Sequence, residues 1–342
     1  MTKVLLTGGA GFVGHHFVNH LLVSTDWEII VLDKLNYASS GLDRLRDINV
    51  FDENRVLILT SDFTKPIEEG LAKEIGDVDY IFHLGAETHV TNSIKDPEPF
   101  VMSNVIGTMR ILDLARKIND LKKIIYFSTD EVFGPAPKGV NFKEWDRYNS
   151  TNPYSASKAG GEELSLAYAN TYGLPLIITH TMNVFGERQH PEKFIPMVIN
   201  KILNNEKITI HSDPTKTIPG SRFWIHARNV SAAIMFLLDK GKNRDKYNIV
   251  GEKEVNNLEM AQFIAKILGR KLKYELVDFH SSRPGHDLRY ALDGTKMRDI
   301  GWKIPISFEQ SLEKTIRWGL NNPKWFDINT YIKPILKRRL SC

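Results

Sequence analysis

Short apolar runs alternate with helix-patterned segments along the first part of the chain. The apolar runs cover residues 3–7, 28–32, 56–59, 80–84 and 123–128. Apolar residues recur at helical spacing over residues 12–23 and 101–118, and residues 154–171 and 176–181 add another helix and strand. Buried runs of this length separated by helices are typical of βαβ units and a parallel sheet. The pattern predicts an α/β fold with a doubly wound parallel sheet.

This alternation ends after about residue 184. Prolines interrupt shorter elements from there on, at Pro191, Pro196, Pro214, Pro219 and Pro284. Helical spacing predicts helices over residues 194–203, 230–239 and 258–268. The predicted organisation is a sheet domain over residues 1–184 to which segments at about 222–250 return, a smaller C-terminal lobe mainly over 185–330, and a basic tail over 331–342.

Charge and composition exclude several classes of protein. The net charge of +4 comes from the tail residues Lys333, Lys337, Arg338 and Arg339, and the rest of the chain is balanced. A balanced body argues against a nucleic-acid-binding face. No apolar run is long enough to span a membrane. The single cysteine, Cys342, cannot form an intrachain disulfide, and a cytoplasmic location fits it.

A glycine-rich turn joins the first predicted strand to the first helix. Residues 7–14 read TGGAGFVG, with Gly8, Gly11 and Gly14 at equal spacing. Glycines allow the backbone to approach a pyrophosphate, and the helix N-terminus supplies free N–H groups. Asp33 ends the second strand and can bind ribose hydroxyls, which favours NAD over NADP, although the adjacent Lys34 weakens that preference. The alternative is a plain tight turn followed by a capping aspartate.

Two groups of polar residues supply candidate chemistry. Tyr154 and Lys158 lie four residues apart on a predicted helix, so the ammonium can stabilise a phenolate that takes a proton from an alcohol. Thr129, Asp130 and Glu131 follow the strand 123–128, at the edge where such sheets place ligands. Two carboxyls with different pKa values can serve as acid and base. An ordinary helix start and a capped loop are the structural alternatives.

Together these motifs resemble the extended short-chain dehydrogenase/reductase family, whose fold is the Rossmann sheet, and within it the nucleotide-sugar 4,6-dehydratases. Five further segments carry the resemblance: residues 84–90, 104–108, 128–134, 191–196 and 283–287.

The resemblance implies a reaction and a role for each catalytic residue. Tyr154 takes the O4 proton of an NDP-hexose while hydride passes to NAD, and Thr129 lies near O4. Glu131 removes the C5 proton, Asp130 protonates the departing C6 hydroxyl, and hydride returns to C6. The product is a 4-keto-6-deoxy sugar. Two alternatives stay open: a nucleotide-sugar 4-epimerase, which shares the glycine turn and the Tyr–Lys pair but lacks Asp-Glu, and a non-catalytic NAD-binding regulator.

The resemblance also assigns binding residues and a homodimer that associates through residues 101–118 and 154–171. The residues implied for NAD are Gly8, Gly11, Phe12, Val13, Gly14, Asp33, Lys34, Asp62, Phe63, Leu84, Ala86, Asn104, Tyr154 and Lys158. The residues implied for the nucleotide sugar are Ser93, Thr129, Asn183, Lys193, Arg222, Asn257 and Arg283. The histidines show no metal-binding spacing, so we expect no metal.

Three segments depart from the family pattern. The loop at residues 212–221 is longer than usual, Arg228 and Asn229 stand where acidic residues are common, and Phe133 replaces a tyrosine. The identity of the nucleotide (dTDP, UDP, GDP or CDP) and of the hexose therefore stays open at this stage, with a dTDP- or UDP-hexose expected.

Overall fold

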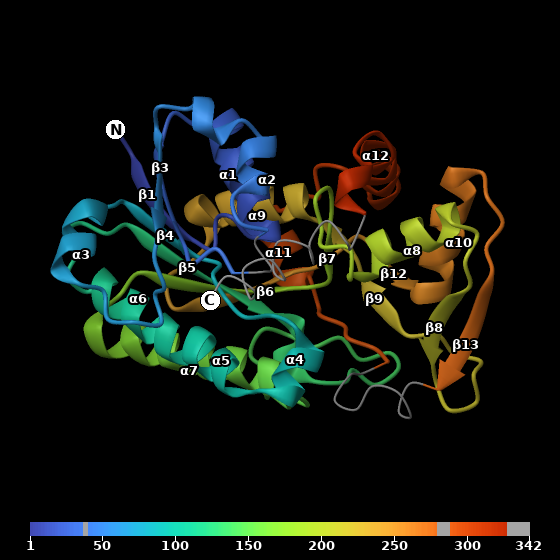
Figure 1. Cartoon of the computed structure of the whole chain (residues 1–342). Helices are drawn as coiled ribbons and strands as arrows, with labels where there is room; N and C mark the ends of the chain where they lie inside the picture. The colour runs from blue at the N-terminus through green and yellow to red at the C-terminus, as the bar shows by residue number, and fades with distance from the viewer. Residues whose placement is uncertain (37–39, 279–287, 327–342) are drawn as a thin grey trace.

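The computed structural model describes residues 1–36, 40–278 and 288–326, and is built around a seven-stranded sheet whose strands all run parallel (Figure 1). In spatial order the strands are β3 (Val56–Thr60), β2 (Glu28–Asp33), β1 (Lys3–Thr7), β4 (Tyr80–His83), β5 (Lys123–Thr129), β6 (Leu176–Thr181) and β11 (Asp245–Ile249). The predicted doubly wound fold is confirmed. The order reverses between β1 and β4, and ligands bind in the crevice that such a reversal opens at the carboxyl ends of the strands.

Helices cover both faces of this sheet (Figure 1). One face carries α1 (Phe12–Ser24), α2 (Asp43–Asp47), α9 (Ala227–Lys240) and α11 (Thr295–Asp299). The other carries α3 (Glu69–Ile75), α6 (Thr108–Ala115) and α7 (Pro153–Tyr172). Fully buried side chains fill both layers, such as Phe17 against Phe82 on the first and Ile111 near Ile178 on the second. This burial explains why the strands read as continuous apolar runs.

The single helix predicted over residues 101–118 is wrong in detail. The segment consists of α5 (Glu98–Val101), a π-helical stretch over Met102–Gly107, and α6, which ends at Ala115. The π stretch turns Asn104 inward, where its side chain accepts from the Glu87 N–H at 2.9 Å and donates to the Glu87 carbonyl at 3.0 Å. Insertions of this kind are frequent at functional sites.

The smaller lobe packs beside the carboxyl edge of the sheet (Figure 1). Its elements are α8 (Phe194–Leu203), α10 (Asn257–Leu268) and α12 (Phe308–Asn321), with the paired strands β8 (Ile208–Ser212) and β13 (Tyr274–Asp278), β9 (Ser221–Phe223) and β12 (Glu254–Asn256), and β7 (Val184–Phe185) and β10 (Ile225–His226). The three helices and strands β7, β8, β12 and β13 share one apolar core, whereas Ile225 of β10 belongs to the core of the sheet domain. The helices predicted at 194–203 and 258–268 match α8 and α10 closely, whereas α12 and strand β11 carry no sequence signal that we used. No helix among the described residues is long and apolar enough to cross a membrane.

Candidate active site

One cavity lies at the carboxyl ends of β1, β4, β5 and β6, and most of the predicted site residues line it. On the cofactor side these are Gly8, Gly11, Phe12, Val13, Gly14, Asp33, Lys34, Phe63, Leu84 and Ala86. On the reaction side they are Thr129, Asp130, Glu131, Tyr154, Lys158, Asn183 and Lys193. The structure therefore brings the glycine turn, the Tyr–Lys pair and the Thr-Asp-Glu triplet to a single site.

Three predicted residues lie behind the walls of that cavity. Asp62 Oδ1 accepts from the backbone N–H of Thr64, as a turn-capping aspartate does. Ser93 is fully buried and its Oγ accepts from the Tyr154 N–H at 3.1 Å, at the start of α7. Asn104 is held against Glu87, as described above. These side chains support the elements that carry the site.

Two further predicted substrate residues, Arg222 and Asn257, lie on the smaller lobe. Arg222 donates to the carbonyl of Leu288 at 2.7 Å and lies 4.5 Å from the ring centre of Tyr290, outside the cavity lining. Burial raises the pKa of Asp130 and Glu131, and the positive charge of Arg222 opposes that rise. Asn257 opens α10, also outside the lining. Arg283 and the segment 283–287 lie outside the described residues.

The glycine turn has room for backbone only. Gly8 has φ +73°, a conformation that favours glycine. A Cβ on Gly14 would lie 2.0 Å from the Gly8 carbonyl oxygen, and one on Gly8 would lie 2.7 Å from Gly85. Gly11 is the N-cap of α1 and makes no side-chain cap, and Gly11, Phe12 and Val13 line the cavity, so the N-terminus of this helix lies at the cavity. The turn fits the pyrophosphate of a dinucleotide.

Asp33 completes the cofactor side. Its carboxylate accepts from the N–H groups of Ala10 at 3.0 Å and Leu35 at 2.8 Å, and burial raises its pKa. Lys34 forms an ion pair with Glu87 at 2.8 Å, so a carboxylate counters its charge. A buried acidic group at the end of β2 fits ribose hydroxyls and disfavours a 2′-phosphate. The residues present therefore fit NAD.

Tyr154 and Lys158 stand in the first turns of α7. Asn152 caps this helix by accepting from the Ser155 N–H at 2.9 Å. Lys158 Nζ donates to the Phe127 carbonyl at 2.7 Å, and burial lowers the pKa of Lys158 to about 7, although Glu162 opposes the shift. Burial and Glu131 raise the pKa of Tyr154, while a hydrogen bond with Thr129 lowers it. A cationic cofactor ring in the cavity would lower the tyrosine pKa further.

The Thr-Asp-Glu triplet ends β5 and begins a short 3-10 turn, Asp130–Phe133. Thr129 Oγ1 donates to Asp130 Oδ1 at 3.0 Å and accepts from the Glu131 N–H at 3.3 Å. Among the described residues, Asp130 Oδ2 is buried with no hydrogen-bond partner. Burial raises the pKa of Asp130 to about 6 and, together with the Asp130 charge, that of Glu131 to about 7. Two such carboxyls hold about one proton between them near neutral pH.

Sequence reasoning missed several residues in the cavity walls, such as Asn36, Arg44, His89 and His190. Arg44 is fully buried and its Nε donates to the Arg188 carbonyl at 3.0 Å. Arg44 lies on α2, which reaches the cavity through tertiary packing. The residues around it in the sequence therefore form no motif that predicts its place in the site. No group of three or more metal-ligating side chains occurs within the described ranges.

The positions that depart from the family pattern lie outside the cavity lining. Arg228 Nη1 approaches Glu187 at 3.5 Å, and Asn229 donates to the Ile306 carbonyl at 2.8 Å. Phe133 is fully buried against Phe142 and His180. These substitutions therefore act on packing between elements.

Known proteins share both the sequence and the fold. The family model described as GDP-mannose 4,6 dehydratase matches residues 5–315. The chain belongs to this family. It is similar to a dTDP-glucose 4,6-dehydratase of Escherichia coli, with 35% identity over 95% of this chain and 94% of that protein. The crystal structure of DesIV, a dTDP-glucose 4,6-dehydratase of Streptomyces venezuelae with NAD bound, superposes with a TM-score of 0.84 and 34% identity over 95% of this chain and 99% of DesIV. The resemblance to the dehydratases found in the sequence is confirmed.

Epimerases are more distant. A UDP-N-acetylglucosamine 4-epimerase of Methanobrevibacter ruminantium M1 superposes with a TM-score of 0.82 but with 25% identity, over 94% of this chain and 99% of that one. The fold is thus common to proteins of both reaction types.

Proposed function

We propose that the protein is an NAD-dependent nucleotide-sugar 4,6-dehydratase, a hydro-lyase that converts an NDP-hexose to its 4-keto-6-deoxy derivative. The observation that carries this proposal is the presence of Thr129, Asp130 and Glu131 beside Tyr154 and Lys158 in one cavity with the glycine turn. An epimerase needs the tyrosine and the lysine alone, whereas loss of water needs an acid and a base as well. The similarity to dehydratases above supports the same choice.

Each residue has a step that suits its surroundings. Tyr154, activated by the buried ammonium of Lys158, accepts the proton of the C4 hydroxyl, and Thr129 holds that oxygen. Once C4 is a ketone the C5 proton is acidic, and Glu131 removes it while Asp130 gives a proton to the departing C6 hydroxyl. NAD, held by the glycine turn and Asp33, supplies when bound the acceptor and later the donor of the hydride.

The two carboxyls constrain this assignment. In the ligand-free protein the pKa of Glu131, about 7, lies above that of Asp130, about 6. The proposed roles need the proton on Asp130 when substrate is bound. Lys193 and Asn152 both favour the ionised form of Glu131, and Thr129 can pass its hydrogen bond to the substrate.

The smaller lobe, built from α8, α10, α12 and the short paired strands, is proposed to hold the nucleotide, and the sheet domain to hold the cofactor. Lys193 in the cavity wall and Arg222 behind it are proposed to counter the diphosphate charge. Ser93 and Asn257 are proposed to act indirectly through α7 and α10, where they lie. We propose dTDP-glucose as the first substrate to test, since the two dehydratases compared above act on it by name, and UDP-glucose as the second.

The test is a mass-spectrometric screen. Purified protein is incubated with NAD and, separately, with dTDP-, UDP-, GDP- and CDP-glucose. The proposal expects one or more products lighter by one water, with NAD recycled and no net NADH. A product of unchanged mass with an inverted C4 hydroxyl would identify an epimerase, and no product in any arm, despite bound NAD, would favour a non-catalytic role.

A homodimer is also proposed, through the helical segments 98–115 and 153–172. Two apolar side chains at this side of the molecule are exposed, Val101 at 45% and Ile94 at 42% of their surface. Burial of such side chains between two copies would stabilise a dimer. Light scattering at micromolar concentration should give twice the mass of the chain, and a monomer mass would refute the proposal.

The proposed location is the cytoplasm. The single cysteine supports a compartment without disulfide formation. Fractionation of the source cells, followed by immunodetection of the protein, tests this directly.

A further inference from the structure

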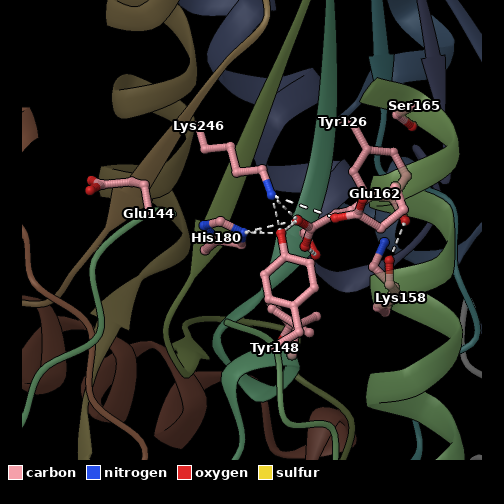
Figure 2. A network of polar contacts seen from close by, with 12 residues as sticks. Tyr126, Glu144, Tyr148, Lys158, Glu162, Ser165, His180 and Lys246 are labelled. Carbon is pink, nitrogen blue, oxygen red and sulfur yellow. Dashed lines mark hydrogen bonds and ion pairs between the residues drawn. The ribbon is translucent and has the colours of Figure 1, made fainter. Parts of the chain in front are cut away.

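A second buried carboxylate lies directly behind the catalytic cavity, and no step above uses it. Glu162 is on α7, one turn after Lys158, and is fully buried. Figure 2 shows its carboxylate at the centre of a polar network contributed by several elements. A fully buried charge is costly unless it is paired.

The carboxylate has a partner on every side. Ser128 Oγ and the Tyr148 hydroxyl both donate to it. His180 Nε2 lies 3.0 Å from Glu162 Oε2 and Lys246 Nζ lies 3.6 Å from the same oxygen (Figure 2). Burial alone would raise the pKa of Glu162, but His180, Lys246 and Ser128 together lower it. The group is therefore ionised at neutral pH.

The network reaches the catalytic residues at two points. Ser128 lines the cavity and directly precedes Thr129, so its bond to Glu162 fixes the end of β5. Lys158 also lines the cavity, and Glu162 raises the pKa of Lys158 against the effect of burial. Residues at i and i+4 of a helix lie on the same side of it.

Other groups around Lys158 do not supply a negative charge. His83, on β4, is neutral because burial lowers its pKa to about 3. The ring centre of Tyr126, on β5, lies 4.3 Å from Lys158 Nζ. Burial raises the pKa of Tyr126 and of Tyr154, so both hydroxyls are neutral. Within the described residues, Glu162 is the anion that acts on Lys158.

We propose that Glu162 is a positioning residue for the reaction: its buried carboxylate, held by Tyr148, His180 and Lys246, balances the buried ammonium of Lys158 and fixes the strand end that carries Thr129. Lys158 must be charged to activate Tyr154. The network thus acts on the reaction through Lys158, without touching the substrate. This role rests on the proposed function, but the charge balance itself can be measured without any substrate.

The direct test follows Lys158 by NMR. Protein labelled with ¹³C-lysine is titrated, and the Lys158 Cε signal is assigned by its absence in a Lys158→Met variant. The inference expects Glu162→Gln to move the Lys158 midpoint down by about one pH unit, because an opposite charge nearby typically shifts a pKa by that order. Glu163→Gln is the matched control, since Glu163 is the next residue on α7 and is 65% exposed. An unchanged midpoint in Glu162→Gln would overturn the inference.

Activity gives the second measurement. In Glu162→Gln the alkaline limb of kcat moves to lower pH, with KM within about twofold of the parent protein, and Glu162→Asp restores much of the limb. A merely structural role would lower kcat equally at every pH. If Glu162→Gln does not fold, Glu162→Gln/Lys246→Met removes both charges of that buried ion pair together. The Lys158 midpoint should still fall, because Glu162 is the anion that raises the Lys158 pKa. Failure of the proposed function would appear differently, as no turnover by the parent protein.

Discussion

The carboxylates at the cavity, Asp130 and Glu131, and the carboxylate of Glu162 on α7 differ in their surroundings. These surroundings shift their pKa values in opposite directions. Asp130 and Glu131 face the cavity with few partners, and burial raises the pKa of both. Glu162 lies behind them, more deeply buried, but its partners lower its pKa. The difference teaches that hydrogen-bond and charge partners, more than depth, decide whether a buried acid is inert or able to exchange protons. Proton-exchange chemistry belongs to the pair at the cavity.

The largest effect expected is on turnover. Glu131→Gln removes the proposed base, so kcat should fall about 10²- to 10⁴-fold, the usual contribution of a general base. The kcat of Asp130→Asn should fall by a similar factor. Steady-state kinetics with the best nucleotide sugar measure this loss, and NAD content measured on the same samples shows that the cofactor side is intact. Full turnover by Glu131→Gln would remove Glu131 from the mechanism.

Stability should change in opposite directions at the two sites. Glu162→Gln leaves the buried ammonium of Lys246 without its ion-pair partner, and breaking a buried pair in this way typically costs about 3–5 kcal/mol. Burial raises the pKa of Glu131 to about 7 in the folded protein, so the folded state loses stability as pH rises towards 7. Above pH 7 the folded protein bears the full cost of the buried, ionised Glu131. Glu131→Gln should therefore raise Tm by about 2–4 °C at pH 8. Thermal unfolding at pH 8 tests both signs, and a lower Tm for both variants would contradict the contrast.

The pH profile separates the two groups as well. kcat/KM should fall below about pH 6, because protonation of both Asp130 and Glu131 leaves no base. Glu131→Gln should change this acid limb, whereas Glu162→Gln should leave it in place and alter the alkaline side. Profiles of kcat/KM from pH 5 to 9 for the parent protein, Glu131→Gln and Glu162→Gln test this difference. An acid limb that moves in Glu162→Gln would mean that Glu162 and the Asp130–Glu131 pair do not titrate independently.

The smallest effect concerns the buried carboxylate of Asp33, on the cofactor side of the cavity. Asp33 is held by two backbone N–H groups and lies away from the reacting end of the cavity. Asp33→Asn should weaken NAD binding about tenfold, the size of one lost charge-assisted hydrogen bond, with kcat at saturating NAD unchanged. Fluorescence titration with NAD measures the affinity. A large loss of kcat at saturating NAD would place Asp33 in the chemistry instead.

The sequence was informative where function is local. The glycine turn, Thr129–Glu131 and the Tyr154–Lys158 pair are each contiguous or one helical turn long, so their spacing alone indicates what they can do. Parallel strands then bring them to one edge without further information. The alternation of strands and helices likewise predicted the doubly wound parallel sheet, but the order of its strands comes from the structure.

The Glu162 network could not be predicted in this way. Its partners Tyr148, His180 and Lys246 come from three separate parts of the chain and meet through packing of β6, β11 and α7. Strand β11 itself went unrecognised because its apolar residues are interrupted by Lys246 and Asn248, whose buried side chains find polar partners. The residues around Ser93 in the sequence also give no indication that its hydroxyl accepts a hydrogen bond at the start of α7.

The central claim is that Asp130 and Glu131 remove water from the sugar. Its most direct test is one reaction of the parent protein with dTDP-glucose and NAD in D₂O, analysed by mass spectrometry and NMR. The account predicts a product lighter by one water that carries solvent deuterium at C5, and no such product from Glu131→Gln. A product that retains all its oxygen atoms, with an inverted C4 hydroxyl and no deuterium at C5, would contradict it.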